Sequence, residues 1–308
     1  MRNDFMIIVS KEIRRKLVEE CSQEDILSLD VKYAKSDSTF CHIRDGIIIF
    51  KNWFRVNVLG KFEVPFMSVL ITQKCTLRCK YCSDLMPYYE NPQHFMYDKI
   101  VFYLEKYLSV VDQVHFLLLC GGETFLYPDL ERLLRHCIEE KKILQIGIVT
   151  NGTIFPDSEM CKLLANPKIR VRVSDYQSVR KKRKEVVRYL KERGVIVEDL
   201  SGQKWYDVGG FYKRGRSDRQ LRQLFHECSM NRCFEINQSR VIYCARQRSG
   251  EIGLTPEIPH EDYVSLKIKN RRILRRKLIE MYDKKFLTTC DYCDGITRYS
   301  QEVTAGEQ

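Results

Sequence analysis

The chain has 308 residues, thirteen cysteines and a formal net charge of +11. Its first residues do not place a charged stretch before an apolar one, so they do not predict a signal peptide. Its longest apolar runs are much shorter than the roughly 20 residues that cross a membrane, and an odd number of cysteines disfavours a secreted disulfide scaffold. We therefore expect a soluble cytoplasmic protein with reduced thiols, long enough for one large domain and a smaller appendage.

The excess of basic residues is concentrated in two predicted helices, residues 179–193 and 270–284. A net positive charge can favour anionic partners such as nucleic acid or a phosphorylated substrate. In both helices, however, the apolar residues recur on one face, so the lysines and arginines cover the opposite, solvent-facing one. Neither segment interleaves basic residues with aromatic ones that would stack on bases. Binding to nucleic acid is therefore not the favoured interpretation.

In chain order, residues 1–62 predict a short N-terminal element of helix and strand, and from residue 66 onward short apolar stretches alternate with amphipathic ones. The predicted strands are residues 66–71, 114–120, 144–150, 169–174 and 195–198, and the predicted helices between them are residues 97–111, 129–141, 158–164 and 179–193. Continuously apolar strands separated by amphipathic helices indicate a parallel sheet buried on both faces. The expected fold class is α/β, a partial (β/α)6-type parallel barrel over residues 63–222 followed by a small cysteine-rich, cluster-binding domain over residues 223–308.

The most informative segment follows the first of these strands. Cys75, Cys79 and Cys82 place three thiols within eight positions. A loop with three thiolates can bind three irons of a 4Fe-4S cluster, and the fourth iron then stays open to another ligand. A structural zinc site is the alternative, and it requires a fourth ligand, which His94 or the Cys41-His42 pair can supply.

The spacing of these cysteines, with the aromatic Tyr81 directly before the last one, resembles the cluster motif of radical S-adenosylmethionine (SAM) enzymes. The resemblance implies a partial barrel, a 4Fe-4S cluster bound by Cys75, Cys79 and Cys82, and SAM bound to the open iron. It also implies reductive cleavage of SAM to a 5′-deoxyadenosyl radical, which abstracts hydrogen from a substrate. A flavodoxin or ferredoxin is the expected reductant.

Further polar motifs fall where the predicted strands end, at the edge that carries the chemistry in parallel barrels. Gly121-Gly122-Glu123 follows the second strand and resembles the family's Gly-Gly-Glu segment, which binds the amino group of SAM. The family often has proline next, where this chain has Thr124. By the same resemblance, polar residues after the later strands and in the cysteine loop are expected to contact the ribose, carboxylate and adenine of SAM. These residues are Thr150, Asn151, Ser174 and Tyr81.

A second group of cysteines lies further along the chain. Cys228 and Cys233 precede a predicted hairpin, Cys244 follows it, and Cys290 and Cys293 form a C-x2-C pair after a predicted helix. This order resembles the SPASM/twitch auxiliary-cluster appendage of some radical SAM enzymes, and it implies a second 4Fe-4S cluster bound by Cys228, Cys244, Cys290 and Cys293. Cys233 is an alternative to Cys228 or a spare thiol. Four thiolates also suit a zinc ion, so zinc is the alternative occupant of this second cysteine group.

We therefore expect an enzyme that acts on a small polar substrate, such as a sugar, a cyclitol or a nucleotide-linked sugar, by dehydrogenation or epimerisation. Cys233 and Cys120 are the candidate hydrogen donors for an epimerisation. One alternative is a radical SAM enzyme that modifies a peptide. Another is a non-catalytic zinc or iron-sulfur protein that binds nucleic acid, which predicts salt-sensitive binding and no cleavage of SAM.

Overall fold

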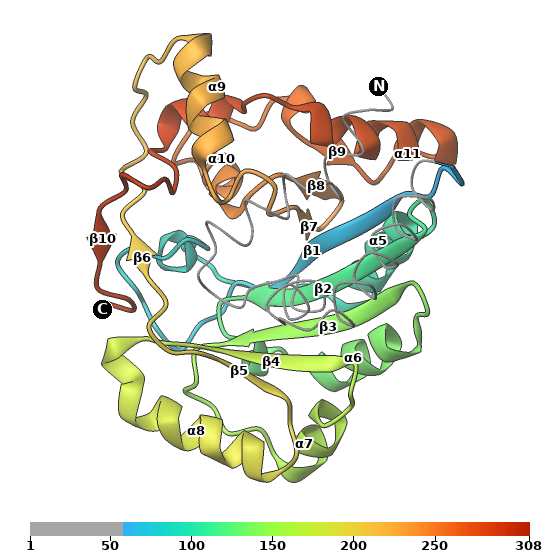
Figure 1. Cartoon of the computed structure of the whole chain (residues 1–308), viewed down its shortest axis with the longest axis vertical. Helices are drawn as coiled ribbons and strands as arrows, with labels where there is room; N and C mark the ends of the chain where they lie inside the picture. The colour runs from blue at the N-terminus through green and yellow to red at the C-terminus, as the bar shows by residue number, and fades with distance from the viewer. Residues whose placement is uncertain (1–57) are drawn as a thin grey trace, which may run out of the picture.

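The computed structural model describes residues 58–308 (Figure 1). The predicted N-terminal element therefore lies outside the described residues except for residues 58–62, which form no helix or strand. An eight-stranded sheet with the order β5-β4-β3-β2-β1-β7-β8-β9 runs through the molecule. Its parallel strands are β1 (Glu63–Thr72), β2 (Gln113–Gly121), β3 (Ile143–Thr150), β4 (Ile169–Ser174), β5 (Val197–Leu200) and β7 (Glu235–Asn237).

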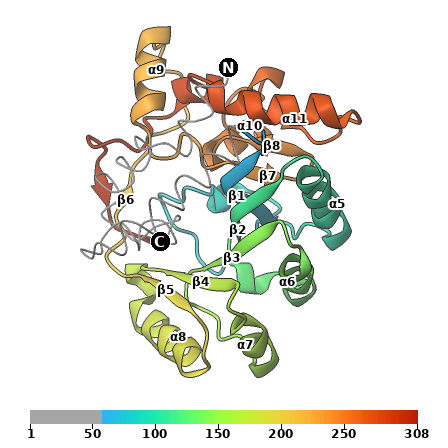
Figure 2. The same ribbon diagram turned by 45° about the vertical axis from the view of Figure 1, so that its right-hand side comes forward.

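Helices cover one face of the curved sheet, so the parallel strands form an open, partial barrel (Figure 2). These helices are α5 (Tyr97–Leu108), α6 (Leu130–Glu139), α7 (Ser158–Leu164) and α8 (Arg180–Glu192). Each joins one parallel strand to the next, as crossover connections in an α/β sheet require. The predicted α/β fold with a partial parallel barrel is confirmed.

The two faces of β2 show how the sequence specifies this arrangement. Leu117 and Leu119 are buried in the main core with side chains from the covering helices. Phe116, Leu118 and Cys120 alternate with them and form a separate cluster on the opposite face, which also includes Phe66 and Val149. Because side chains alternate along a strand, this second cluster lies on the inner, concave face of the barrel. We call that surface the inner face.

The rest of the chain closes one edge of the barrel. The predicted hairpin is confirmed: β7 and β8 (Arg240–Ile242) pair antiparallel, β9 (Val264–Ser265) adds to β8, and β7 pairs parallel with β1. Helix α9 (Asp218–Glu227) begins with a capping box at Ser217 and spans the expected domain boundary at residue 222. The remaining elements are α10 (Arg248–Glu251), α11 (Arg271–Glu280), and the antiparallel pair β6 (Trp205–Tyr206) and β10 (Glu302–Val303).

Short 3-10 helices connect several of these elements, and the last of them carries Cys290. They are η1 (Met86–Tyr88), η2 (Thr124–Leu126), η3 (Gln177–Val179), η4 (Ala245–Gln247), η5 (His260–Asp262), η6 (Met281–Asp283) and η7 (Thr288–Tyr292). None of the helices formed by residues 58–308 combines the length and the apolarity needed to cross a membrane.

Candidate functional site

The three predicted cluster ligands lie in the loop after β1, at the carboxyl edge of the parallel strands. Cys79 is buried, and Cys75 and Cys82 are half-buried. Burial raises the pKa of the Cys75 and Cys79 thiols above their ordinary value and raises that of Cys82 to about 12. A desolvated thiolate needs a compensating positive charge, which a bound metal provides. The donor set therefore fits an iron-sulfur cluster.

Two side chains from distant parts of the chain donate hydrogen bonds to these sulfurs. The Asn151 amide contacts the Cys75 sulfur at 3.6 Å and the Thr76 hydroxyl at 2.9 Å. The Gln308 amide contacts the Cys79 sulfur at 3.4 Å. Hydrogen bonds to cluster sulfurs orient the ligands and help to set the reduction potential. Asn151 was expected to contact SAM, and the structure gives it this further role beside the thiols.

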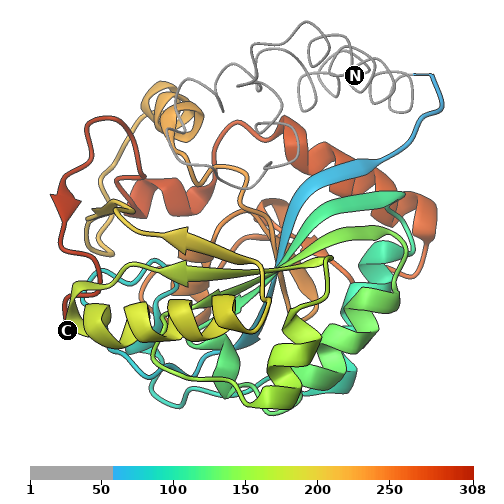
Figure 3. The ribbon, with the colours of Figure 1, turned by 60° about the horizontal axis from the view of Figure 1, so that its bottom comes forward.

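Gln308 belongs to a segment that crosses the cysteine loop, residues 302–308, which we call the strap. Beyond β10 the strap passes η3, directly before α8 (Figure 3), and the Gln177 amide of η3 donates to the Ala305 carbonyl at 3.1 Å. It then reaches the loop itself, where the Lys80 amide donates to the Glu307 carbonyl at 2.7 Å. The Arg78 amide donates to the Gln308 side-chain oxygen at 2.8 Å. Sequence reasoning did not find the strap, because no motif marks it.

The Gly121-Gly122 turn lies directly against the segment that leads into the cysteine loop. A Cβ at Gly121 would stand 2.1 Å from the Thr72 carbonyl oxygen, and one at Gly122 would stand 2.2 Å from the Lys74 carbonyl oxygen. Real Cβ atoms do not approach so closely, so both positions require glycine. These glycines let the end of β2 support the cysteine loop.

Glu123 is completely buried at this turn. Its carboxylate accepts hydrogen bonds from the Thr150 hydroxyl at 2.9 Å and from the backbone amides of Asn151 and Phe125 at 2.8 and 3.1 Å. Burial raises the pKa of Glu123 to about 7, while these hydrogen bonds act in the opposite direction. Glu123 therefore joins the ends of β2 and β3. Its expected contact with the amino group of SAM stays a prediction.

The remaining predicted SAM contacts share the same edge of the sheet. Thr150 and Ser174 end β3 and β4 and are buried, whereas Tyr81 is half-buried in the cysteine loop. The alternative zinc ligand His94 instead hydrogen-bonds the Thr72 hydroxyl through Nδ1 at 2.8 Å. The other alternative, the Cys41-His42 pair, lies outside the described residues.

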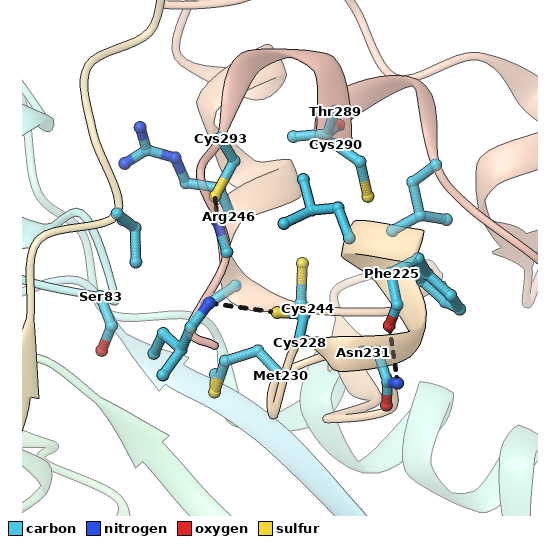
Figure 4. A pocket seen from close by; sticks show the side chains of 16 residues that line it. Ser83, Phe225, Cys228, Met230, Asn231, Cys244, Arg246, Thr289, Cys290 and Cys293 are labelled. Carbon is cyan, nitrogen blue, oxygen red and sulfur yellow. Dashed lines mark hydrogen bonds between the residues drawn. The ribbon is translucent and has the colours of Figure 1, made fainter. Parts of the chain in front are cut away.

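The second group of cysteines surrounds a cavity of about 60 Å³. Cys228, Cys244, Cys290 and Cys293 line this cavity, and their side chains converge on it (Figure 4). Burial raises the pKa of Cys228 and Cys244 and raises that of Cys290 to about 12. Within residues 58–308, no group of three or more His, Cys, Asp or Glu side chains is arranged to hold a single metal ion.

Cys233, the fifth thiol of this region, does not line the cavity. Its sulfur contacts the Ser229 carbonyl at 3.9 Å and the Met230 sulfur at 3.8 Å. The other candidate hydrogen donor, Cys120, lies on the inner face of the barrel. Its sulfur contacts the Val69 carbonyl at 3.5 Å and the Glu235 carboxylate at 3.9 Å.

Arg216 holds the C-x2-C segment in place and was not singled out as a ligand-positioning residue from the sequence. One terminal nitrogen of its guanidinium donates to the carbonyl oxygens of Cys290 and Cys293, at 3.0 and 2.8 Å. The other donates to Asp294 at 2.7 Å. Asp294 also pairs with Arg214 at 2.6 Å. Both arginines thus serve the cysteine segment.

Comparison with known proteins bears on these assignments. The sequence model described as "Radical SAM superfamily" matches residues 69–202, from β1 through the cysteine loop to the end of β5. These residues form a radical SAM domain. The match includes the cysteine loop, the Gly121–Glu123 turn and the ends of β3 and β4.

Relatives of the radical SAM domain include two proteins named "GTP 3′,8-cyclase". The one from Aliarcobacter butzleri (strain RM4018) is 24% identical over 143 residues, which are 46% of this chain and 42% of the relative. The one from Sulfurovum sp. (strain NBC37-1) is 23% identical over 180 residues, 56% of this chain and 53% of the relative. The chain therefore spans about half the length of these curated relatives.

Among solved structures, "Crystal structure of BtrN in complex with AdoMet and 2-DOIA" aligns with a TM-score of 0.50 and 14% identity. The alignment covers 77% of this chain and 98% of that chain. At this identity the likeness concerns the fold alone. The aligned part of this chain is longer than the radical SAM domain and continues beyond residue 202, where that domain ends.

Proposed function

We propose that this chain is a radical SAM enzyme in which Cys75, Cys79 and Cys82 bind a 4Fe-4S cluster and the enzyme abstracts hydrogen from a small polar substrate. The observation that carries the proposal is the position of these three thiols at the carboxyl edge of a partial parallel barrel, inside the matched domain. When bound, the cluster and SAM supply the electron transfer and the carbon-sulfur cleavage that start hydrogen abstraction.

The protein's own residues would orient and shield this chemistry. Asn151 and Gln308 hold the sulfurs of Cys75 and Cys79 by hydrogen bonds. Glu123 fixes the turn that supports the loop. Apolar side chains of the inner face, such as Phe116 and Leu118, are buried next to this edge of the sheet and would exclude water from a reactive intermediate.

We further propose that Cys228, Cys244, Cys290 and Cys293 bind a second, auxiliary 4Fe-4S cluster. Support comes from the cavity that these four thiols share and from the separate location of Cys233. Zinc is the competing occupant, because four thiolates suit both. A fully protein-ligated cluster near the barrel can accept an electron from a substrate, which would make the net reaction an oxidation.

The proposed substrate is a sugar, cyclitol or nucleotide-linked sugar, with dehydrogenation or epimerisation as the reaction. Of the two candidate hydrogen donors, Cys120 has the better position, since it lies on the inner face and Cys233 does not line the cavity. A peptide substrate is the alternative. A flavodoxin or ferredoxin as reductant and a cytoplasmic location also remain predictions.

The decisive experiment is anaerobic reconstitution of the full chain with iron and sulfide, followed by addition of dithionite and SAM. We expect 5′-deoxyadenosine, and its formation should be lost in Cys79→Ala. The matched control is Cys161→Ala, which removes a buried thiol of α7 that packs in the core. Retention of activity in Cys79→Ala, or absence of product from the wild-type chain loaded with iron, would overturn the proposal.

A further inference from the structure

The inner face carries a group of buried charges close to the cysteine loop. Arg248, at the start of α10, is wholly buried and forms ion pairs with Asp84 of the loop and with Glu235 of β7, the latter at 3.4 Å. Glu235 is opposite Ser68 in the sheet and touches the sulfur of Cys120. This group therefore links the cysteine loop, the inner face and the segment that follows Cys244.

Several polar atoms of this group have no hydrogen-bond partner within residues 58–308. They are the Tyr89 hydroxyl, Oε1 of Glu235, and Nε and Nη1 of Arg248, all of them buried. Arg248 and Glu235 are 0% and 2% exposed, so solvent does not reach them. Burial raises the pKa of the Tyr89 hydroxyl and the neighbouring charge of Arg248 opposes that rise, so Tyr89 lies within reach of Arg248. Nε of Arg248 and Oε1 of Glu235 face each other in the 3.4 Å ion pair without forming a hydrogen bond, and Nη1 of Arg248 has neither an ion pair nor a hydrogen bond among these residues. Buried polar groups are nearly always hydrogen-bonded, so this group lacks a hydrogen-bonding partner.

The types of unpaired atom restrict what the partner can be. Arg248 offers only N–H donors, Glu235 offers a carboxylate acceptor, and Tyr89 offers both. A phosphate group supplies acceptors alone and would meet the negative charges of Glu235 and Asp84. An ammonium group supplies donors alone and leaves the N–H donors of Arg248 without an acceptor. Hydroxyl groups supply donor and acceptor together, so adjacent hydroxyls can pair with all of these atoms.

We infer that Tyr89, Glu235 and Arg248 form the substrate-recognition site and that they bind adjacent hydroxyl groups of a neutral polyol or sugar. This inference rests on the proposed radical SAM function, whose substrate class it specifies. The site lies beside Cys120 and the loop that carries Cys82. It also explains why two nitrogens of a wholly buried arginine form no hydrogen bond within residues 58–308, an arrangement that otherwise destabilises the fold.

Tyr89→Phe is the sharpest test, because the hydroxyl that it removes neighbours Arg248 but forms no hydrogen bond of ordinary geometry within residues 58–308. Binding of myo-inositol, D-glucose and N-acetylglucosamine to the reconstituted chain would be measured by saturation-transfer NMR, with inorganic phosphate and cyclohexylamine as charged probes. We expect at least one neutral polyol to bind, and its affinity to fall roughly fivefold in Tyr89→Phe, the effect of one lost hydrogen bond. The melting temperature should not fall. The control is Tyr299→Phe, at a tyrosine that is 73% exposed.

Glu235→Gln provides a second variant that keeps the side-chain shape and alters the acceptor. It should also weaken polyol binding. Failure of all three polyols to bind at millimolar concentration, unchanged affinity in both variants, or tighter binding of phosphate would each overturn the inference. Formation of 5′-deoxyadenosine by the same preparation tests the enzyme proposal separately. Cleavage without polyol binding refutes only the recognition site, and binding without cleavage refutes only the enzymatic function.

Discussion

The two cysteine sites of this protein are built in different ways. Cys75, Cys79 and Cys82 come from one loop, whose path is set by β1 and by the glycine turn after β2. The auxiliary set comes from three separate places: the end of α9, the second residue after β8, and the segment around η7. The first site is local in sequence, whereas the second exists only once distant segments have packed.

This difference predicts different responses to mutation. A local loop keeps its thiols close together even when its surroundings loosen, because few residues separate them. The auxiliary thiols rely on tertiary contacts such as those of Arg216, so a remote change can separate them. The barrel site should therefore tolerate damage elsewhere better than the auxiliary site does.

The largest effect is expected for the double variant Cys290→Ala/Cys293→Ala, which tests whether the two sites are independent. It should lower the iron content by roughly half, given two clusters of similar size, and spare uncoupled cleavage of SAM at the barrel site. Iron per chain and 5′-deoxyadenosine would be measured on the same sample. An unchanged iron content would mean that the auxiliary cavity holds zinc or nothing, and a loss of cleavage would mean that the two sites are not independent.

Arg216→Ala should have an intermediate effect. The change leaves the carbonyl oxygens of Cys290 and Cys293 without their donor, so we expect the free energy of unfolding to fall by about 1 to 3 kcal/mol. Iron should also leave the auxiliary site faster, as followed by transfer to a chelator. The control is Arg222→Ala on α9, whose partner Asp218 is 4.0 Å away at the surface. Equal effects of the two variants would contradict a positioning role for Arg216.

Gln308→Ala should have the smallest effect and should act on the barrel site alone. Loss of the hydrogen bond to the Cys79 sulfur removes stabilisation of the more negative, reduced cluster. We expect a midpoint potential roughly 20 to 40 mV more negative, the equivalent of about 0.5 to 1 kcal/mol for a one-electron couple. A redox titration monitored by electron paramagnetic resonance measures this midpoint potential, and Gln301→Ala is the control. An identical potential in the two variants would argue that the contact does not affect the cluster.

Much of the barrel could be predicted because its strands are continuously apolar and its helices are amphipathic. The prediction of residues 169–174 and 158–164 agrees with β4 and α7. The strand predicted at residues 195–198 was wrong by two positions, since β5 runs from Val197 to Leu200. The backbone amide of Val195 bonds the Leu190 carbonyl and so completes the end of α8 after Gly194, which has a φ of 74°. In the sequence, the apolar Val195 of this helix cap cannot be told from the first residue of a strand, so the strand was predicted to start too early.

The candidate sites also contain some features that the sequence predicts and others that only the structure reveals. The cysteine loop and the Gly121–Glu123 turn could be found from spacing and from their place after strands. The contacts of Gln308, Arg216 and Arg248 could not, because single polar residues become informative only when the fold brings them to a partner. Burial of Glu123 was not foreseen either, since its carboxylate serves the backbone of two strands.

The strap also bears on the order in which the protein is assembled during translation. Cys79 and Gln308 are separated by 229 positions, yet their side chains meet. The ribosome makes the cysteine loop early and residues 302–308 much later, and domains tend to fold in the order of synthesis. The nascent barrel must therefore present its thiols before their last hydrogen-bond donors exist. A cluster inserted at that stage would lack the Gln308 hydrogen bond to the Cys79 sulfur until the strap docks.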